Sequence, residues 1–232
     1  MEAFRFNSKL IGESKINEST KVLYFEVPEN FEFSAGQYVM MAFYKDGRRI
    51  LRSYSIFSSP SEKGKISIFF KKVEGGYASN FLFNMKIGEQ IEMKGPLGNF
   101  TVRNPSKDIF LISSGTGFGP FKSMIKNMSE KKSPQKIYLA RGFKNETDLC
   151  SEEELREISL SGNLKYFNVL SRPTDEGYIY KGHVQDFLDK FIPEGFNGDF
   201  YICGLKEMVF EVREKLGKMG IASQRIFFER YD

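Results

Sequence analysis

The sequence predicts two domains, an antiparallel β-barrel of Greek-key type followed by an α/β domain with a doubly wound, five-stranded parallel sheet. Three observations support this prediction. The chain has 232 residues, more than most single hydrophobic cores hold. Residues 1–103 contain short runs that alternate between apolar and polar side chains, whereas short apolar runs followed by helical periodicity begin at Asp108. We place the hinge near Asn104-Pro105 and predict domains at 1–104 and 105–232.

The predicted barrel strands have a period of two and are separated by Gly and Pro residues, as strands bounded by turns are. These runs are 22–27, 37–43, 66–73 and 90–94, and the stretch LRSYSIFSSP at 51–60 contains the end of a further strand. One segment breaks the pattern, because the pair Gly75-Gly76 precedes a single helical turn at 77–82.

The second half alternates strands and helices, which predicts a parallel sheet with helical crossovers. The expected strands are 109–112, 137–140, 166–170, 200–202 and 226–228. Apolar side chains recur between them at helical spacing, at Phe121, Met124, Ile125 and Met128; Leu155 and Ile158; Val184, Phe187, Leu188 and Phe191; and Val209, Val212, Leu216 and Met219. Ser151 and Glu154 have the spacing of a capping box, so we expect a helix to begin there.

Composition excludes several classes of protein. No apolar run approaches the roughly 20 residues of a membrane span, and the N-terminal residues lack a signal core, so we expect a cytoplasmic protein. Two cysteines are too few for an iron–sulfur cluster, and the single histidine argues against a zinc or other metal site. Any redox chemistry must therefore use a bound organic cofactor or a separate partner.

The net charge of +4 lies entirely in the first half of the chain. Residues 1–104 hold 15 Lys and Arg against 11 Asp and Glu, while residues 105–232 hold 19 of each kind. A basic surface can attract an acidic protein partner, although a solvated surface without a partner has the same composition. Nucleic acid binding would need denser stripes of Lys and Arg.

Unusual residues follow each strand of the predicted parallel sheet, where such sheets bind ligands. They are Gly115-Thr116-Gly117-Phe118-Gly119-Pro120, Arg141, Ser171-Arg172, Cys203-Gly204 and Glu229. The glycine loop has two interpretations. It brings a phosphate close to a helix N-terminus, or it is an ordinary tight turn. Arg172 has the fork that suits a ribose phosphate, and otherwise is a surface arginine. Cys203 suits the side of a nicotinamide ring, and otherwise is a small buried hydrophobe.

Further short segments occur in a fixed order along almost the whole chain. They are Gly36-Gln37-Tyr38, Arg52-Ser53-Tyr54-Ser55, Gly76-Tyr77-Ala78-Ser79, Gly95-Pro96-Leu97-Gly98-Asn99-Phe100, the glycine loop, Cys203-Gly204 and the terminal Glu229-Arg230-Tyr231. Each alone is a weak match. Together they resemble the motifs of the ferredoxin–NADP reductase superfamily, in the order of its FAD-binding barrel and its NAD(P)-binding α/β domain.

The resemblance implies a flavin site on the barrel. Arg52 would neutralise the FAD diphosphate, Tyr54 would pack against the flavin ring, and Ser55 would hydrogen-bond near flavin N5. The remaining FAD contacts implied by the resemblance are Ser53, Gly75, Gly76, Tyr77, Ala78, Ser79 and the terminal aromatic residue Tyr231. The side chains suit these roles, because a diphosphate favours a permanently charged fork and a flavin favours an aromatic face.

The resemblance also implies a nucleotide site and a reaction. NAD(P)H would bind Gly115, Thr116, Gly117, Phe118, Gly119, Pro120, Arg141, Ser171, Arg172, Cys203 and Gly204. Hydride would pass to flavin N5 near the catalytic residues Ser55, Cys203 and Glu229. Ser171-Arg172 resembles a pair that holds the 2′-phosphate, with Arg141 and Lys181 adding charge, so NADPH is slightly preferred over NADH.

The resemblance leaves several functions open. We expect an NAD(P)H-dependent flavoprotein reductase that delivers electrons to an acidic ferredoxin or flavodoxin on the basic barrel side. The alternatives are the reductase component of an oxygenase or cytochrome system, a reductase that uses flavin as a diffusible substrate, and a non-catalytic nucleotide-binding electron-transfer subunit. Retention of Ser55, Cys203 and Glu229 disfavours the last of these.

Overall fold

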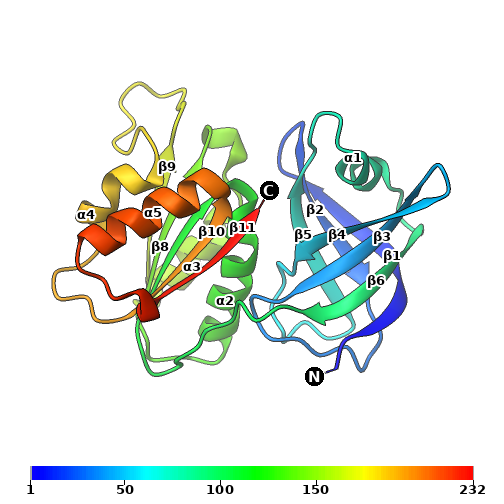
Figure 1. Cartoon of the computed structure of the whole chain (residues 1–232), viewed down its shortest axis with the longest axis horizontal. Coiled ribbons are helices and arrows are strands. Elements are labelled where there is room, and N and C mark those ends of the chain that lie inside the picture. Colours follow the sequence, from blue (N-terminus) through cyan, green and yellow to red (C-terminus); the bar gives the residue numbers. More distant parts are fainter. Residues whose placement is uncertain (1, 232) are drawn as a thin grey trace. The chain divides into compact units, whose positions relative to one another are not determined.

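The computed structural model of the chain describes residues 2–231, and it divides into two compact units (Figure 1). The first unit contains the residues up to Thr101 together with Gly119–Asn127, and the second contains Val102–Phe118 and the residues from Met128 onward. No helix within residues 2–231 is long and apolar enough to cross a bilayer. The boundary at residue 104 stays a prediction.

The first unit is a curled antiparallel sheet of six strands. They are β1 (Phe4–Lys15), β2 (Thr20–Glu26), β3 (Tyr38–Lys45), β4 (Arg48–Ser55), β5 (Lys65–Lys71) and β6 (Gln90–Leu97), with α1 (Tyr77–Asn84) before β6. The order β4-β3-β6-β1-β2-β5 is of Greek-key type, because β6 inserts between β3 and β1. A bridge between Ile56 and Ile68 joins the two edges of the sheet. The predicted barrel is thereby confirmed.

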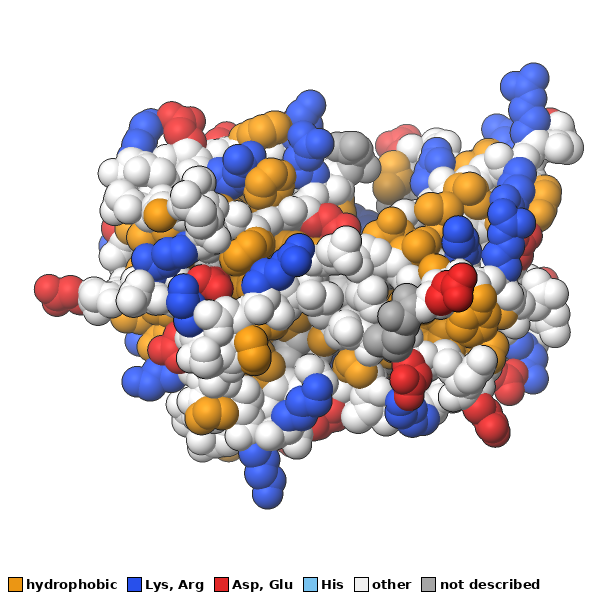
Figure 2. All heavy atoms as spheres, turned by 60° about the horizontal axis from the view of Figure 1, so that its bottom comes forward, with side chains coloured by type: hydrophobic (Ala, Val, Ile, Leu, Met, Phe, Trp, Pro, Cys, Tyr) orange, Lys and Arg blue, Asp and Glu red, His pale blue; other side chains and the backbone are white. Residues whose placement is uncertain are grey.

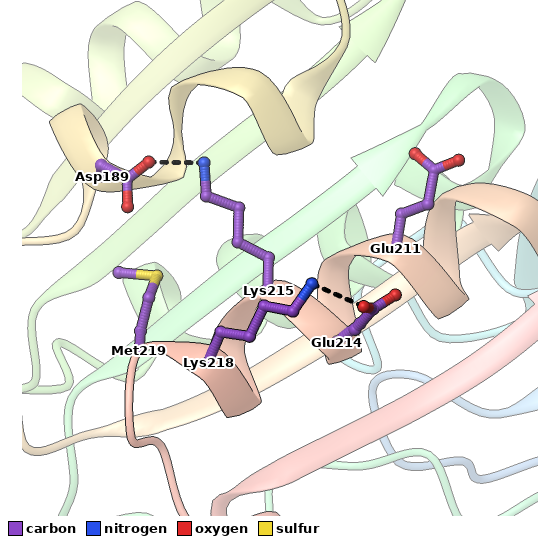
Figure 3. Close-up of a pocket in the computed structure, with 6 residues that line it drawn as sticks. All are labelled: Asp189, Glu211, Glu214, Lys215, Lys218 and Met219. Atoms are coloured by element: carbon purple, nitrogen blue, oxygen red, sulfur yellow. Dashed lines mark ion pairs between the residues drawn. The ribbon is translucent and has the colours of Figure 1, made fainter.

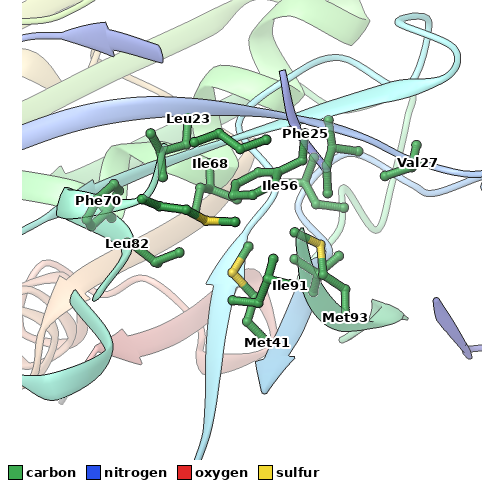
Figure 4. Packing of buried hydrophobic residues seen from close by; sticks show 14 of the residues in the cluster. Leu23, Phe25, Val27, Met41, Ile56, Ile68, Phe70, Leu82, Ile91 and Met93 are labelled. Carbon is green, nitrogen blue, oxygen red and sulfur yellow. The ribbon is translucent and has the colours of Figure 1, made fainter. Parts of the chain in front are cut away.

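The core of this unit lies inside the curled sheet (Figure 4). Alternate residues of each strand face it, for example Val39, Met41 and Phe43 of β3, which are all buried. Leu82 brings α1 onto the same cluster. Because successive side chains point to opposite faces, Met40 and Tyr44 lie on the outer face of the sheet.

The second unit is a parallel sheet in the order β11-β10-β7-β8-β9, which is the predicted doubly wound arrangement. Its strands are β7 (Ile109–Ser114), β8 (Ile137–Phe143), β9 (Leu164–Leu170), β10 (Asp199–Leu205) and β11 (Ile226–Tyr231). The helices of this half of the chain are α2 (Phe118–Glu130), α3 (Glu152–Leu160), α4 (Leu188–Phe191) and α5 (Lys206–Lys218). Most of α2, Gly119–Asn127, is grouped with the first unit, and only its two ends belong to the second. Side chains of α4 and α5 pack with Phe110, Ile112 and Ile202 on one face of the sheet.

The structure corrects several local predictions. The strand β1, which has twelve residues, was not among the predicted runs, and α1 has two turns where one was expected. The expected helix from Val184 to Phe191 is a 3₁₀ turn, Val184–Phe187, followed by the short α4.

The capping box at Ser151 is also wrong. Ser151 has φ +57° and its side chain forms no capping hydrogen bond, whereas a capping serine needs extended backbone. Contacts on both sides of Ser151 hold this conformation. Arg141 binds the carbonyl of Cys150 and the side chain of Glu152.

Candidate active site

The end of β4 presents a cation and an aromatic ring on the same face. Arg52 and Tyr54 are two residues apart, so their side chains point the same way. Arg52 is exposed, and its guanidinium Nη1 donates to the carbonyl oxygen of Leu51 at 2.8 Å. The ring of Tyr54 lies at 6.4 Å from that of Phe43 and 6.3 Å from that of Phe70. Burial raises the pKa of Tyr54 to about 12, against the opposing charge of Arg52.

The turn before α1 is tightly packed around a glycine. A Cβ at Gly76 would lie 2.8 Å from Ser79 Oγ and 3.0 Å from Val73 Cβ, so no larger residue fits there. Ser79 Oγ accepts from the Val73 amide at 3.0 Å and donates to the Gly76 carbonyl at 3.2 Å. The hydroxyl of Ser79 is therefore engaged inside the turn. The first amides of α1, beginning at Tyr77, point out of the helix end, as helix N-termini require.

These two features fit the diphosphate and ring of a flavin. The exposed Arg52 forms no ion pair with any described residue, so its charge is available to an anion. Tyr54 is half-buried, which leaves part of its ring accessible. The amides at the start of α1 add a second anion-binding group. Arg52 and Tyr54 would hold FAD, while Ser53 is exposed and lies on the opposite face of β4.

A row of polar residues crosses the parallel sheet near the carboxyl ends of its strands. Strand pairing places Glu229 of β11 beside Cys203 of β10, Cys203 beside Ser113 of β7, Ser113 beside Arg141 of β8, and Arg141 beside Asn168 of β9. Residues paired in this way point to the same face of a sheet. Polar groups from five strands therefore share one face at the edge where such sheets bind ligands.

Cys203, Glu229 and Tyr231 form the centre of this site. Burial and then the charge of Glu229 raise the pKa of the fully buried Cys203 thiol well above its usual value, and a hydrogen bond with Tyr231 opposes that rise. Cys203 is therefore a thiol and not a thiolate at neutral pH. Burial also raises the pKa of Glu229. Glu229 Oε2 and Ser113 Oγ are buried without a hydrogen-bond partner among residues 2–231.

The glycine loop after β7 lies directly against the end of β10. A Cβ at Gly117 would lie 2.3 Å from the Cys203 carbonyl oxygen and 2.6 Å from Gly204 Cα. Gly204 has φ +147°, and a Cβ there would lie 2.3 Å from Ser114 Oγ. Only glycine permits this approach of two backbones. The unpaired polar atoms, the backbone approach and the N-terminus of α2 together fit a pyridine dinucleotide.

The loop that carries Ser171 and Arg172 is held by a carboxylate. Glu146 accepts hydrogen bonds from the amide and hydroxyl of Thr174 and from the amide of Asp175. These bonds, the Thr174 amide first, lower the pKa of Glu146 to about 2, so it stays ionised at neutral pH. The Arg172 side chain is exposed at the start of this loop, where a phosphate can reach it.

The burial of Arg141 argues against a direct contact of its side chain with the nucleotide. Its side chain is fully buried and its donors are used within the protein, at Asn168, Cys150 and Glu152. Burial lowers its pKa to about 10, so it remains charged. A guanidinium without exposed surface cannot bind a ribose phosphate directly. Lys181 is exposed and stays a candidate.

The predicted residues thus fall into two groups. Arg52, Tyr54 and Ser55 lie at the end of β4 in the first unit, with Gly75 to Ser79 at the start of α1. Gly115 to Phe118, Cys203, Gly204, Glu229 and Tyr231 lie together in the second unit. The encounter of Ser55 with Cys203 and Glu229 stays a prediction.

Sequence reasoning assigned no role to Ser113, Asn168 or Glu152. Ser113 lies two residues before Gly115, the first residue of the glycine loop, and this position was a usable signal. Asn168 and Glu152 gain their importance only from contact with Arg141, and no sequence pattern reports such a contact.

A surface pocket of about 400 Å³ lies in the second unit, between α4 and α5 (Figure 3). Lys215 pairs with Asp189 at 2.5 Å and Lys218 with Glu214 at 2.6 Å along its wall. The remaining charged group, Glu211, accepts a hydrogen bond from Gln185, and no predicted site residue lines the pocket.

Comparisons with known proteins agree with this geometry. The model of the oxidoreductase FAD-binding domain matches residues 7–102, and that of the oxidoreductase NAD-binding domain matches residues 111–214. A toluate 1,2-dioxygenase electron transfer component from Pseudomonas putida is 30% identical over 97% of this chain, which spans only 66% of that protein. Ferredoxin–NADP reductase B from Sorangium cellulosum is 29% identical over 100% of both chains.

The fold matches solved structures as well. A ferredoxin NADP⁺ reductase from Neisseria gonorrhoeae, with bound FAD and NADP, superposes with a TM-score of 0.87 over 97% of this chain and 98% of the other, at 19% identity. The two cofactor-domain models match in the expected order, and one relative aligns from end to end. Together with the geometry of both sites, these matches show that this chain belongs to the ferredoxin–NADP reductase superfamily of FAD-dependent NAD(P)H oxidoreductases.

Proposed function

We propose that the protein oxidises NAD(P)H and delivers the electrons, through FAD, to a ferredoxin or flavodoxin. The observation that carries this proposal is the group formed by the buried Cys203 and the half-buried Glu229 and Tyr231. This group adjoins the glycine loop through the contact of Gly117 with Cys203. When bound, FAD accepts hydride from the nicotinamide and releases electrons to the acceptor. The protein supplies position, electrostatics and exclusion of water.

Each residue has a defined part in this proposal. Cys203 gives the nicotinamide a small, uncharged surface, because its thiol keeps its proton. Glu229 Oε2 accepts a hydrogen bond from the bound nucleotide when it is ionised. Burial raises the pKa of Glu229, so it holds a proton there more readily than an exposed glutamate does. Tyr231 covers the site until the nicotinamide enters. Arg52 and Tyr54 hold the flavin, with the Ser55 hydroxyl near the reacting atom.

An anaerobic titration of the purified protein with NADPH and, separately, NADH tests the proposal. Bleaching of the visible flavin band at near-stoichiometric nucleotide is the expected result. A yellow protein that neither nucleotide reduces would contradict it and support a non-catalytic subunit. A protein that retains no FAD but reduces added flavin would identify the diffusible-flavin reductase.

We further propose a slight preference for NADPH, carried by Arg172. Replacing Arg172 with Ala removes a charge-assisted contact to the 2′-phosphate, worth roughly 1.5–3 kcal/mol, or about 10- to 100-fold in kcat/KM for NADPH. NADH lacks this phosphate, so its kcat/KM should change less than about twofold. Steady-state kinetics with both nucleotides measures the difference.

A matched control is Arg156→Ala, which removes an exposed arginine on α3. Equal losses with the two nucleotides in the Arg172 variant would refute the phosphate role.

The outer face of the barrel is the proposed docking surface for the electron acceptor. Arg5 and Lys94 lie directly opposite each other on β1 and β6, and no ion pair joins either to a described residue. Like charges in this position destabilise a sheet, so folding alone does not explain them. Tyr44 and Leu51 on the same face are 58% and 41% exposed. Figure 2 shows Lys and Arg beside hydrophobic side chains on this unit, as an acidic protein partner requires.

Reversing the charge of Lys94 distinguishes an effect on partner docking from an effect on the stability of the fold. Lys94→Glu should weaken electron delivery to an acidic [2Fe–2S] ferredoxin about 5- to 10-fold at low salt and much less at high salt. The melting temperature should stay equal or rise, because Arg5 then faces an opposite charge. Reduction of menadione, a neutral acceptor, should not change.

The control for this experiment is Lys131→Glu, which alters the net charge equally on an exposed residue of the second unit. If both variants slow ferredoxin reduction to the same extent, the effect belongs to net charge and the surface is wrongly assigned.

A second candidate function is the reductase component of an oxygenase or cytochrome system. It is favoured by the similarity over 97% of this chain to the toluate 1,2-dioxygenase electron transfer component. The two functions share every step up to the reduced flavin and differ in the acceptor. Rates of electron transfer to ferredoxin, flavodoxin, cytochrome b5 and an oxygenase component distinguish the two functions.

The cytoplasmic location of the protein stays a prediction.

A further inference from the structure

Arg141 joins three segments of the second unit. Its Nε donates to Asn168 Oδ1 at 2.8 Å, its Nη1 donates to the Cys150 carbonyl at 2.7 Å, and its Nη2 pairs with Glu152. Asn168 in turn donates to Glu152 at 3.0 Å, which closes the network. The residues before and after Ser151, at the start of α3, are thus tied to β8 and β9.

The same guanidinium packs against the nucleotide loop. Its central carbon lies 4.7 Å from the ring centre of Phe118, which is fully buried. Phe118 is the first residue of α2 and directly follows Gly117, the residue in contact with the backbone of Cys203. A cation held over an aromatic ring in a buried setting is a strong contact. Any displacement of Arg141 therefore shifts the ring that sets the position of the loop.

We propose that Arg141 is a positioning residue for the dinucleotide, acting through Phe118 on the glycine loop and the first amides of α2. This inference rests on the proposed function for its nucleotide. The loop meets the pyrophosphate, which NADPH and NADH share, so Arg141 acts equally on both nucleotides. Arg172 acts on NADPH alone, which makes the two arginines separable by experiment.

The test uses Arg141→Lys, which keeps the charge and loses the planar fork, and Phe118→Leu, which removes the aromatic face. Each should raise KM for NADPH and NADH by the same factor, about fivefold, with kcat changed less than twofold. Calorimetry with ADP-ribose, which has the pyrophosphate without the nicotinamide or 2′-phosphate, should show the same loss of affinity. The double variant should be no worse than the poorer single variant, because both act on one contact.

A milder pair of variants covers the case in which Arg141→Lys does not fold. Glu152→Gln weakens one partner of Arg141 at a half-exposed position and should raise the dissociation constant for ADP-ribose about twofold or more. Glu153→Gln, at the exposed neighbouring position, should leave it unchanged.

Three results would overturn the inference. The first is an unchanged affinity for ADP-ribose in folded variants whose melting temperatures are lowered. The others are additive losses of affinity in the double variant and a rise in KM that is confined to NADPH. Failure of the proposed function looks different. In that case the wild type is not reduced by either nucleotide, while the binding measurements with ADP-ribose still report on Arg141.

Discussion

Replacing Arg52 with Ala will cause the protein to lose FAD on purification. Arg52 is the exposed, permanently charged group on the Tyr54 face of β4. A charge-assisted contact to a phosphate contributes roughly 1.5–3 kcal/mol, so the dissociation constant for FAD should rise about 10- to 100-fold. The ratio of visible to ultraviolet absorbance after gel filtration, and a fluorescence titration with FAD, measure the loss.

Two variants sharpen this prediction. Arg52→Lys keeps a point charge without the bidentate fork and should fall between the wild type and the Ala variant. Arg49→Ala is the control, because Arg49 lies on the opposite face of the same strand and pairs with Glu92 at 2.5 Å. The diphosphate role fails if the Arg52 and Arg49 variants retain FAD equally.

Replacing Gly117 with Ala will have the largest effect in the second unit. The added Cβ would lie 2.3 Å from the Cys203 carbonyl oxygen, a backbone atom that cannot rotate away. The loop must therefore move from the end of β10, at an overpacking cost of about 1–3 kcal/mol or more. Reduction of the flavin by either nucleotide should fall at least about 100-fold, because the amides no longer meet the pyrophosphate and the loop no longer lies against Cys203.

The control is Gly162→Ala, in the turn after α3 and outside the glycine loop. Gly162 has φ +87°, so alanine is strained there, but nothing lies within 4 Å of the added Cβ. This variant should lose about 2–4 °C in melting temperature for each kcal/mol of strain and retain most activity. Similar activity in both variants would show that contact with Cys203 does not matter. FAD content should be normal in each, since Arg52 and Tyr54 are untouched.

The pattern of apolar residues predicts most of the fold because burial imposes a period of two on strands and of 3.6 on helices. The five parallel strands were predicted in this way and are confirmed. The capping box at Ser151 failed because a contact distant in sequence decides that backbone. Arg141 holds Cys150 and Glu152, and Ser151 between them takes a left-handed conformation.

The candidate site, like the fold, has features that the sequence predicts and features that only the structure reveals. Gly117, Cys203 and Glu229 follow strands of a parallel sheet, so topology alone places them at one edge. The row in which Cys203 lies between Glu229 and Ser113 depends on strand register, and so do the unpaired oxygens of Ser113 and Glu229.

The sequence by itself determined the fold class, the order of the two cofactor domains and the residues that can bind an anion, because these depend on periodicity, strand ends and side-chain chemistry. Only the tertiary structure decided which arginine side chains are exposed and able to bind an anion. Arg52 and Arg141 follow similar strand patterns, yet Arg52 is exposed and Arg141 is fully buried in contact with Asn168, Glu152 and Phe118. The physical reason is that the availability of a charge depends on its neighbours in space, and folding brings those neighbours from distant parts of the chain.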